Sequence, residues 1–81
     1  MNISLLFFAS AQDATGTADL AWECSPGSTV EQCAIELATR FPALQELVPR
    51  VRFAVNAEFA TLSTVLKEGD TLAFLPPMSG G

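Results

Sequence analysis

Histidine and tyrosine are absent from this sequence, and basic residues are few. Without histidine the chain lacks the commonest general base and the commonest zinc ligand. A self-sufficient hydrolase or zinc enzyme is therefore not expected, and neither is a metal site. Only 4 of the 81 residues are Lys or Arg against 9 Asp or Glu, a net charge of −5. Nucleic acid is not an expected partner, because binding to its backbone needs clustered bases. Arg50 and Arg52 flank Val51 at the start of a predicted strand, where they form a solvated edge or meet an acidic partner.

Long hydrophobic runs and disulfide patterns are also lacking. No stretch approaches the roughly 20 apolar residues of a membrane span, so no membrane is expected. The apolar residues 3–9 have no basic residue before them and are too few for a signal peptide. Two cysteines, Cys24 and Cys33, are too few for a secreted disulfide scaffold. The sequence therefore predicts a cytoplasmic protein.

Apolar residues make up 49 % of the chain, enough for one small domain with its own core. Asn56 suits a positive φ and predicts a tight turn over residues 56–58. A second turn is expected at 67–70. Residues 10–17 are small and polar and are predicted to form a loop with room for one helical turn. Continuous or alternating apolar patterns predict strands over residues 3–9, 19–24, 51–55, 59–62 and 71–75.

One clear helix is predicted between the second and third strands. Ser28 and Glu31 have the spacing of a capping box, and Pro42 ends the helix. Residues 43–48 are expected to form a short second turn. We interpret the two cysteines as packing residues, with a redox or sulfur-relay role as the alternative. Apolar side chains recur along one face of the helix at Val30, Cys33, Ala34, Leu37, Ala38 and Phe41.

The order of elements is strand, strand, helix, strand, short strand, strand. It predicts an α+β fold in which a mixed sheet packs on one main helix. The hairpin, the helical crossover and the final strand indicate a β-grasp roll with the first and last strands side by side at its centre. We expect residues 1–75 to form this domain and residues 76–81 to form an extended, flexible C-terminal tail.

A single helix covers one face of the sheet, so the other face is expected to be polar. By strand alternation, Ser4 and Thr71 mark the outward side of the first and last strands. We interpret the apolar side chains on this outward side as a surface for a partner protein. Loops folding over the face, or an alternation displaced by one residue, are the alternatives. The apolar residues on this side are Leu6, Phe8 and Leu75, with Phe59 beside them.

The C-terminal segment has no charged side chain from Thr71 onward. Pro76 and Pro77 direct it away from the sheet, because proline cannot donate to a ladder. Gly80 and Gly81 lack Cβ atoms and can thread a narrow channel. The terminal carboxylate can then be activated as a mixed anhydride with a nucleotide and converted by a sulfur nucleophile into a thiocarboxylate. A frayed end with incidental glycines is the alternative.

The sequence resembles the small, sulfur-carrying subunit of molybdopterin synthase, the MoaD family of ubiquitin-like proteins. The resemblance spans essentially the whole chain and is strongest at residues 6–9, 54–56 and 68–81. In the last of these segments a Gly-Asp turn, an apolar strand, Pro-Pro and a terminal Gly-Gly follow one another in register. The family's β-grasp fold agrees with the order of elements.

The resemblance also implies a reaction cycle. An E1-like enzyme uses ATP to adenylate Gly81, and a sulfur donor enzyme converts the adenylate into a thiocarboxylate. The tail then enters the large catalytic subunit and gives sulfur to cyclic pyranopterin monophosphate, forming the dithiolene of molybdopterin. Two small and two large subunits form a heterotetramer. The small subunit is not catalytic alone and holds no cofactor stably, since ATP is used by the activating enzyme.

By the resemblance, Gly81 is the reactive residue, supported by Gly80. Leu75 replaces an aromatic residue common in the family, and residues 10–14 lack a base that some relatives carry.

Two other functions stay open. One is a sulfur carrier for thiamine synthesis or tRNA thiolation, or a protein conjugator; the other is a non-catalytic β-grasp interaction module. The partner-binding residues that the resemblance implies are Phe8, Phe59, Leu75, Pro76, Pro77, Met78 and Ser79.

Overall fold

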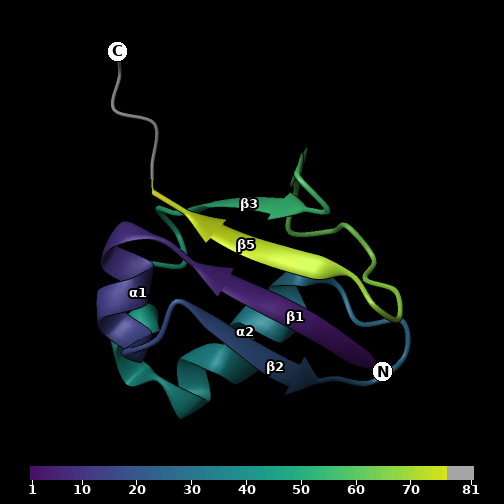
Figure 1. Cartoon of the computed structure of the whole chain (residues 1–81), viewed down its shortest axis with the longest axis horizontal. Coiled ribbons are helices and arrows are strands. Elements are labelled where there is room, and N and C mark those ends of the chain that lie inside the picture. The colour runs from purple at the N-terminus through teal and green to yellow at the C-terminus, as the bar shows by residue number, and fades with distance from the viewer. Residues whose placement is uncertain (77–81) are drawn as a thin grey trace.

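A mixed sheet of five strands carries two α-helices in the computed structural model, which describes residues 1–76 (Figure 1). The strand order is β2-β1-β5-β3-β4, with β1 and β5 parallel and the other neighbours antiparallel. The first and last strands therefore lie side by side at the centre, which confirms the predicted β-grasp fold. In chain order the elements are β1 (Asn2–Phe7), α1 (Ala9–Thr15), β2 (Asp19–Glu23), α2 (Val30–Arg40), the 3₁₀ turn η1 (Pro42–Leu44), β3 (Arg52–Val55), β4 (Glu58–Ala60) and β5 (Thr71–Leu75).

The core lies between one face of the sheet and α2, which runs behind β1 and β2 in Figure 1. Alternate residues of the central strands point into it, as the predicted alternation requires. The Phe74 ring of β5 lies 5.2 Å from the Phe7 ring and 5.0 Å from the Phe53 ring, measured between centroids. Except for the half-buried Phe41, the predicted apolar stripe of α2 is buried.

The cap of α2 lies one residue later than predicted. Thr29 is the N-cap, and its hydroxyl accepts from the Gln32 N–H at 3.2 Å. The Gln32 side chain accepts in return from the Thr29 N–H at 2.9 Å. The predicted pair of Ser28 and Glu31 was wrong because Ser28 is buried in the preceding turn. There its hydroxyl donates to the Ser25 carbonyl at 2.7 Å.

The prediction of a loop with one helical turn over residues 10–17 was wrong, because the seven-residue helix α1 occupies most of this segment. Only Ala11 of α1 is fully buried, so the sequence shows no apolar stripe that would have predicted the helix. Gly16 ends α1 with φ of 76°, and its N–H donates to the Gln12 carbonyl at 2.8 Å. Strand boundaries also differ: β1 ends at Phe7, two residues before the predicted end, and β4 covers Glu58–Ala60 in place of 59–62.

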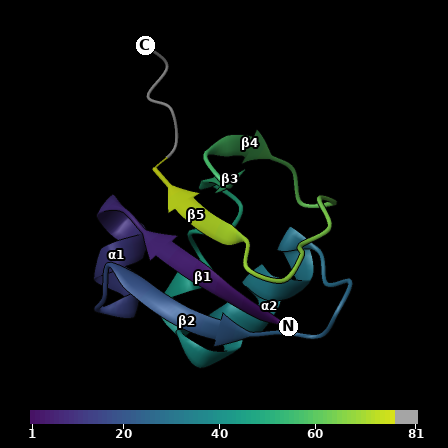
Figure 2. The same cartoon turned by 45° about the vertical axis from the view of Figure 1, so that its right-hand side comes forward.

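Both edges of the sheet and both ends of its strands are visible in the turned view (Figure 2). β4 lies beyond β3 at one edge, and β2 forms the other. β1 leads into α1 at the end of the sheet where β5 finishes, as expected for parallel neighbours. Leu75 closes β5, and the following Pro76 is exposed. Within residues 1–76, none of the helices is long and apolar enough to cross a membrane.

Candidate functional site

A groove of about 460 Å³ lies on the outer face of the sheet, opposite α2. Four outward side chains form a row across it, fixed by the strand register. Leu6 of β1 lies opposite Ala73 of β5, which pairs with Ala54 of β3, which in turn pairs with Phe59 of β4. The row is therefore large, small, small, large. The two alanines make the floor, and the leucine and phenylalanine stand at its sides.

The end of the groove lies where β5 finishes. Phe8 follows β1, and its N–H still donates to the Phe74 carbonyl at 3.2 Å, so the residue stays beside β5. Phe8 is also the N-cap of α1, which turns the chain away and leaves the ring 44 % exposed. Leu75 lines the groove from β5. The groove thus opens at the foot of the C-terminal segment.

The β3–β4 hairpin holds Phe59 at the side of the groove. Its two-residue turn places Asn56 and Ala57 at positive φ, 53° and 69°, as type I′ turns require. The Asn56 amide donates to Asp70 Oδ1 at 2.9 Å and accepts from the Thr71 N–H at 2.9 Å. The hairpin is thereby joined to the start of β5. Phe59 is 71 % exposed and has little packing of its own, so the turn sets its position.

The structure brings together three of the residues that the sequence predicted for partner binding. Phe8, Phe59 and Leu75 all line the groove, and Pro76 stands exposed directly after it. The predicted Pro77, Met78, Ser79, Gly80 and Gly81 lie outside the described residues. Sequence reasoning missed the floor, Ala54 and Ala73. Their small size in strands otherwise rich in Leu and Phe was the available signal, but only the register shows that they are neighbours.

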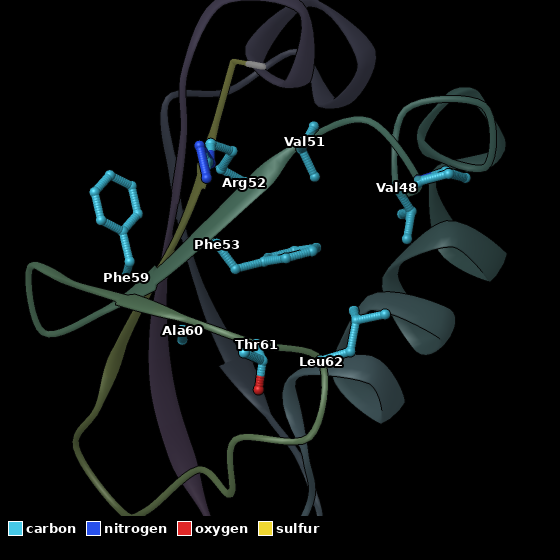
Figure 3. A pocket seen from close by; sticks show the side chains of 9 residues that line it. Val48, Val51, Arg52, Phe53, Phe59, Ala60, Thr61 and Leu62 are labelled. Atoms are coloured by element: carbon cyan, nitrogen blue, oxygen red, sulfur yellow. The ribbon is translucent and has the colours of Figure 1, made fainter. Parts of the chain in front are cut away.

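A second hollow, of about 270 Å³, opens beside β3 and β4 (Figure 3). The Phe53 ring points from β3 into it, between Val48 and Leu62. Phe59 points to the opposite side of the sheet, beside Arg52. Phe59 lines both hollows, whereas Arg52 lines the second one. Only the outer groove includes side chains from both central strands.

The chemistry available at the groove is binding. Its lining has no acid, base, thiol or primary alcohol, consisting of Leu6, Phe8, Ala54, Asn56, Ala57, Phe59, Thr71, Ala73 and Leu75. The thiols lie in the core on the other side of the sheet. Burial raises the pKa of the Cys33 thiol to about 12, with further contributions from Cys24 and Glu36. Burial also raises the pKa of Cys24. Among residues 1–76, no cluster of three or more His, Cys, Asp or Glu side chains could hold a metal ion.

Comparison with known families decides the relationship that these features indicate. The model of the ThiS family matches residues 5–81. The chain belongs to the ThiS family. Among curated relatives of this ThiS family chain, the molybdopterin synthase sulfur carrier subunit of Arabidopsis thaliana is 41 % identical over 81 residues, covering 100 % of this chain and 84 % of the relative. The protein of the same name from Mycobacterium tuberculosis is 34 % identical over 82 residues, covering 100 % and 99 %.

A solved structure shows that the fold also matches across the whole ThiS family chain. SAMP1 from Haloferax volcanii superposes with a TM-score of 0.87 at 26 % identity, covering 100 % of both chains. The match includes the β-grasp sheet that forms the groove. The resemblance noted in the sequence, to the sulfur-carrying subunit of molybdopterin synthase, is thus confirmed by the curated relatives and is consistent with the fold.

Proposed function

We propose that this ThiS family chain is the sulfur carrier subunit of molybdopterin synthase. The observation that carries the proposal is the full-length match to curated subunits of that name, at up to 41 % identity. The apolar groove supports it, because a carrier that presents its C-terminus to another protein needs a docking surface at the foot of that segment. The carrier is not catalytic alone, since its curated relatives are named as the sulfur carrier subunit of a synthase.

The reacting group in this proposal is the carboxylate of Gly81. Oxygen of this carboxylate attacks the α-phosphorus of ATP on an E1-like enzyme, and pyrophosphate leaves. Sulfur at the oxidation level of sulfide, supplied by a donor enzyme, then attacks the acyl carbon. AMP leaves with the bonding electron pair, and a thiocarboxylate remains. Transfer of this sulfur to cyclic pyranopterin monophosphate builds one half of the dithiolene, so two charged carriers are consumed for each molybdopterin.

The principal partner in this proposal is the large catalytic subunit, in a heterotetramer of two small and two large subunits. Phe8, Phe59 and Leu75 bury their exposed apolar surface against it, and the residues from Pro76 to Gly81 enter its active site. We place the cycle in the cytoplasm. The free thiols of Cys24 and Cys33 are consistent with a reducing compartment.

Intact mass spectrometry tests the proposal. The purified chain is incubated with its E1-like enzyme, ATP and a sulfur source, and we expect the mass gain that replaces one terminal oxygen by sulfur. A chain lacking Gly81 is the matched control and should show no gain. The charged carrier is then added to the large subunit and cyclic pyranopterin monophosphate, and molybdopterin should form. An unchanged mass, an equal gain without Gly81, or full activity after removal of Gly80 and Gly81 would each refute the proposal; the last would indicate an interaction module.

Protein conjugation is the second candidate, because the structural match SAMP1 is a small archaeal modifier protein. In that case Gly81 forms an amide with a lysine of another protein. Such adducts appear in cells as larger species that resist thiols and hydroxylamine, whereas a thiocarboxylate does not enlarge the chain. Copurification of a thiazole synthase or of a tRNA-thiolating enzyme, in place of the large synthase subunit, would redirect the assignment to those pathways.

A further inference from the structure

The outer face of the sheet has an uneven distribution of charge. Strand register places Asp19 and Glu23 of β2 on this face, because they pair with the outward residues Leu6 and Asn2 of β1. At the other side of the groove, Arg52 of β3 pairs with Leu75 and so faces outward as well. Arg52 is the only basic side chain that the five strands direct to this face.

Arg52 lies beside the groove, against the ring of Phe59, which lines the groove. Its guanidinium carbon lies 5.3 Å from the centroid of the Phe59 ring, a cation–π distance. Figure 3 shows both side chains on the same side of the hairpin, away from Phe53. A stacked guanidinium keeps the N–H donors on its edge available for a carboxylate, which an ammonium group on a flexible stem does not offer in the same geometry. The charge is therefore fixed at the foot of the C-terminal segment.

Docking a partner on the groove changes the surroundings of this charge. Phe59, which the guanidinium contacts, is 71 % exposed and must be covered if the groove is to be filled. Covering it also removes water from Arg52. A desolvated and unpaired charge is costly, so a protein that binds here tightly has to supply an opposite charge. The occupant is therefore a protein surface with an apolar centre and an acid at its margin.

We propose that Arg52 binds a carboxylate of the large synthase subunit and that this contact fixes the orientation of the carrier at the groove. The inference rests on the proposed function. Arg52 is a positioning residue, since it does not touch the reacting atoms.

Calorimetric titration of the large subunit with the full-length carrier tests the inference. We expect Arg52→Gln to raise Kd about tenfold and Arg52→Glu about a hundredfold, because the second change sets two acids against each other. Arg52→Lys should fall between Arg52→Gln and the unaltered chain. The gap between Arg52→Gln and the unaltered chain should narrow as NaCl is raised from 0.05 to about 0.5 M, since salt screens the pair.

Lys67→Glu is the matched control. It changes the net charge by the same amount as Arg52→Glu. Lys67 is exposed and precedes the first residue of β5, whereas Arg52 pairs with Leu75, the last residue of β5. The two ends of β5 are about 13 Å apart. The Kd of Lys67→Glu should stay within about twofold of the unaltered chain. Thermal unfolding of each variant verifies folding, and Arg52→Gln and Arg52→Lys suffice if Arg52→Glu does not fold.

Two results would overturn the inference. One is that Arg52→Glu binds the large subunit as tightly as Lys67→Glu does, and the other is that Arg52→Gln loses the same affinity at every salt concentration.

Failure of the proposed function looks different. In that case the unaltered carrier acquires no thiocarboxylate or gives no sulfur to the large subunit, whatever residue occupies position 52. If Arg52 variants lose thiocarboxylation by the activating enzyme and still bind the large subunit normally, the carboxylate belongs to that enzyme, and the inference is wrong while the function stands.

Discussion

Two alanines on the outer face of β3 and β5 determine the shape of the groove. Ala54 and Ala73 pair directly, so no large side chain rises between Leu6 and Phe59. Alanine also keeps its backbone hydrogen bonds in the ladder between β3 and β5, so the hollow forms without a break in the sheet. At the scale of single residues, the shape of the groove therefore depends on its small side chains as much as on its large ones.

Filling the hollow should block docking. We expect Ala73→Leu to weaken binding to the large subunit at least tenfold, because the added side chain occupies space that the partner needs. The matched control is Ala21→Leu, the same change at an exposed outward position on β2 outside the groove lining. Calorimetric titration measures both. Equal affinity for the two variants would show that the groove is not the contact surface.

Phe59 should matter for binding and little for stability. Its ring is 71 % exposed, so Phe59→Ala should change the free energy of unfolding by no more than about 0.5 kcal/mol. An aromatic anchor at an interface contributes about 2 kcal/mol, so Kd should rise about thirtyfold. Leu62→Ala is the control, since Leu62 is 43 % exposed and lies outside the groove. A comparable loss of affinity in Leu62→Ala would contradict this assignment.

Cys33 should make stability sensitive to alkaline pH. Its pKa in the folded chain is raised from 9.0 to about 12 by burial. The stabilisation linked to the protonated Cys33 thiol is therefore fully present below pH 9. It should fall by about 1 kcal/mol for each pH unit between pH 9 and pH 12, where the unfolded chain has lost the proton that the folded chain retains. Urea unfolding at pH 8, 9.5 and 10.5 measures the slope, and Cys33→Ala should reduce it. A slope unchanged in Cys33→Ala would refute the assignment.

At the scale of elements, the β3–β4 hairpin connects sheet geometry to the groove. Asn56 occupies a positive φ, and its side chain forms two hydrogen bonds to the start of β5. Asn56→Ala removes both bonds and places an alanine in the left-handed region. We expect a loss of about 2 kcal/mol in the free energy of unfolding, measured by urea titration.

A change at the adjacent position should have the opposite sign. Ala57 has φ of 69° without a hydrogen-bonding side chain, so Ala57→Gly should raise stability by up to about 1 kcal/mol. If Ala57→Gly lowered the free energy of unfolding as much as Asn56→Ala does, the positive φ of Ala57 would not be a source of backbone strain.

The elements also show how far sequence reasoning extends. Strands and α2 were predictable because burial imposes a period of two or of 3.6 on their residues, as in Leu72 and Phe74. Helix α1 was not predictable, because it buries only Ala11 and its end depends on Gly16 in the left-handed region. The predicted cap of α2 was one residue early because Ser28 and Thr29 both carry a hydroxyl that can cap a helix. The structure distinguishes them: Ser28 donates to the Ser25 carbonyl in a buried turn, and Thr29 caps the helix. For the groove, the walls were predictable from alternation, whereas the alanine floor required the pairing of β3 with β5.

At the scale of the whole molecule, β5 joins two halves that have no other ladder between them. The β1–β2 hairpin lies on one side of it and the β3–β4 hairpin on the other. A chain ending at Asp70 should therefore not fold, whereas a chain ending at Pro76 should, since the sheet and the core lie within residues 1–76. Far-ultraviolet circular dichroism and cooperative urea unfolding test the pair. Cooperative unfolding of the shorter chain would contradict the central role of β5.

The central place of β5 also has a mechanical consequence. A pull on the segment beyond Leu75 runs along a strand that is hydrogen-bonded to β1 on one edge and to β3 on the other. Such a force lies across the hydrogen bonds and loads them together, whereas peeling an edge strand would break them one after another. A pull on this segment should therefore leave the sheet from which it emerges intact.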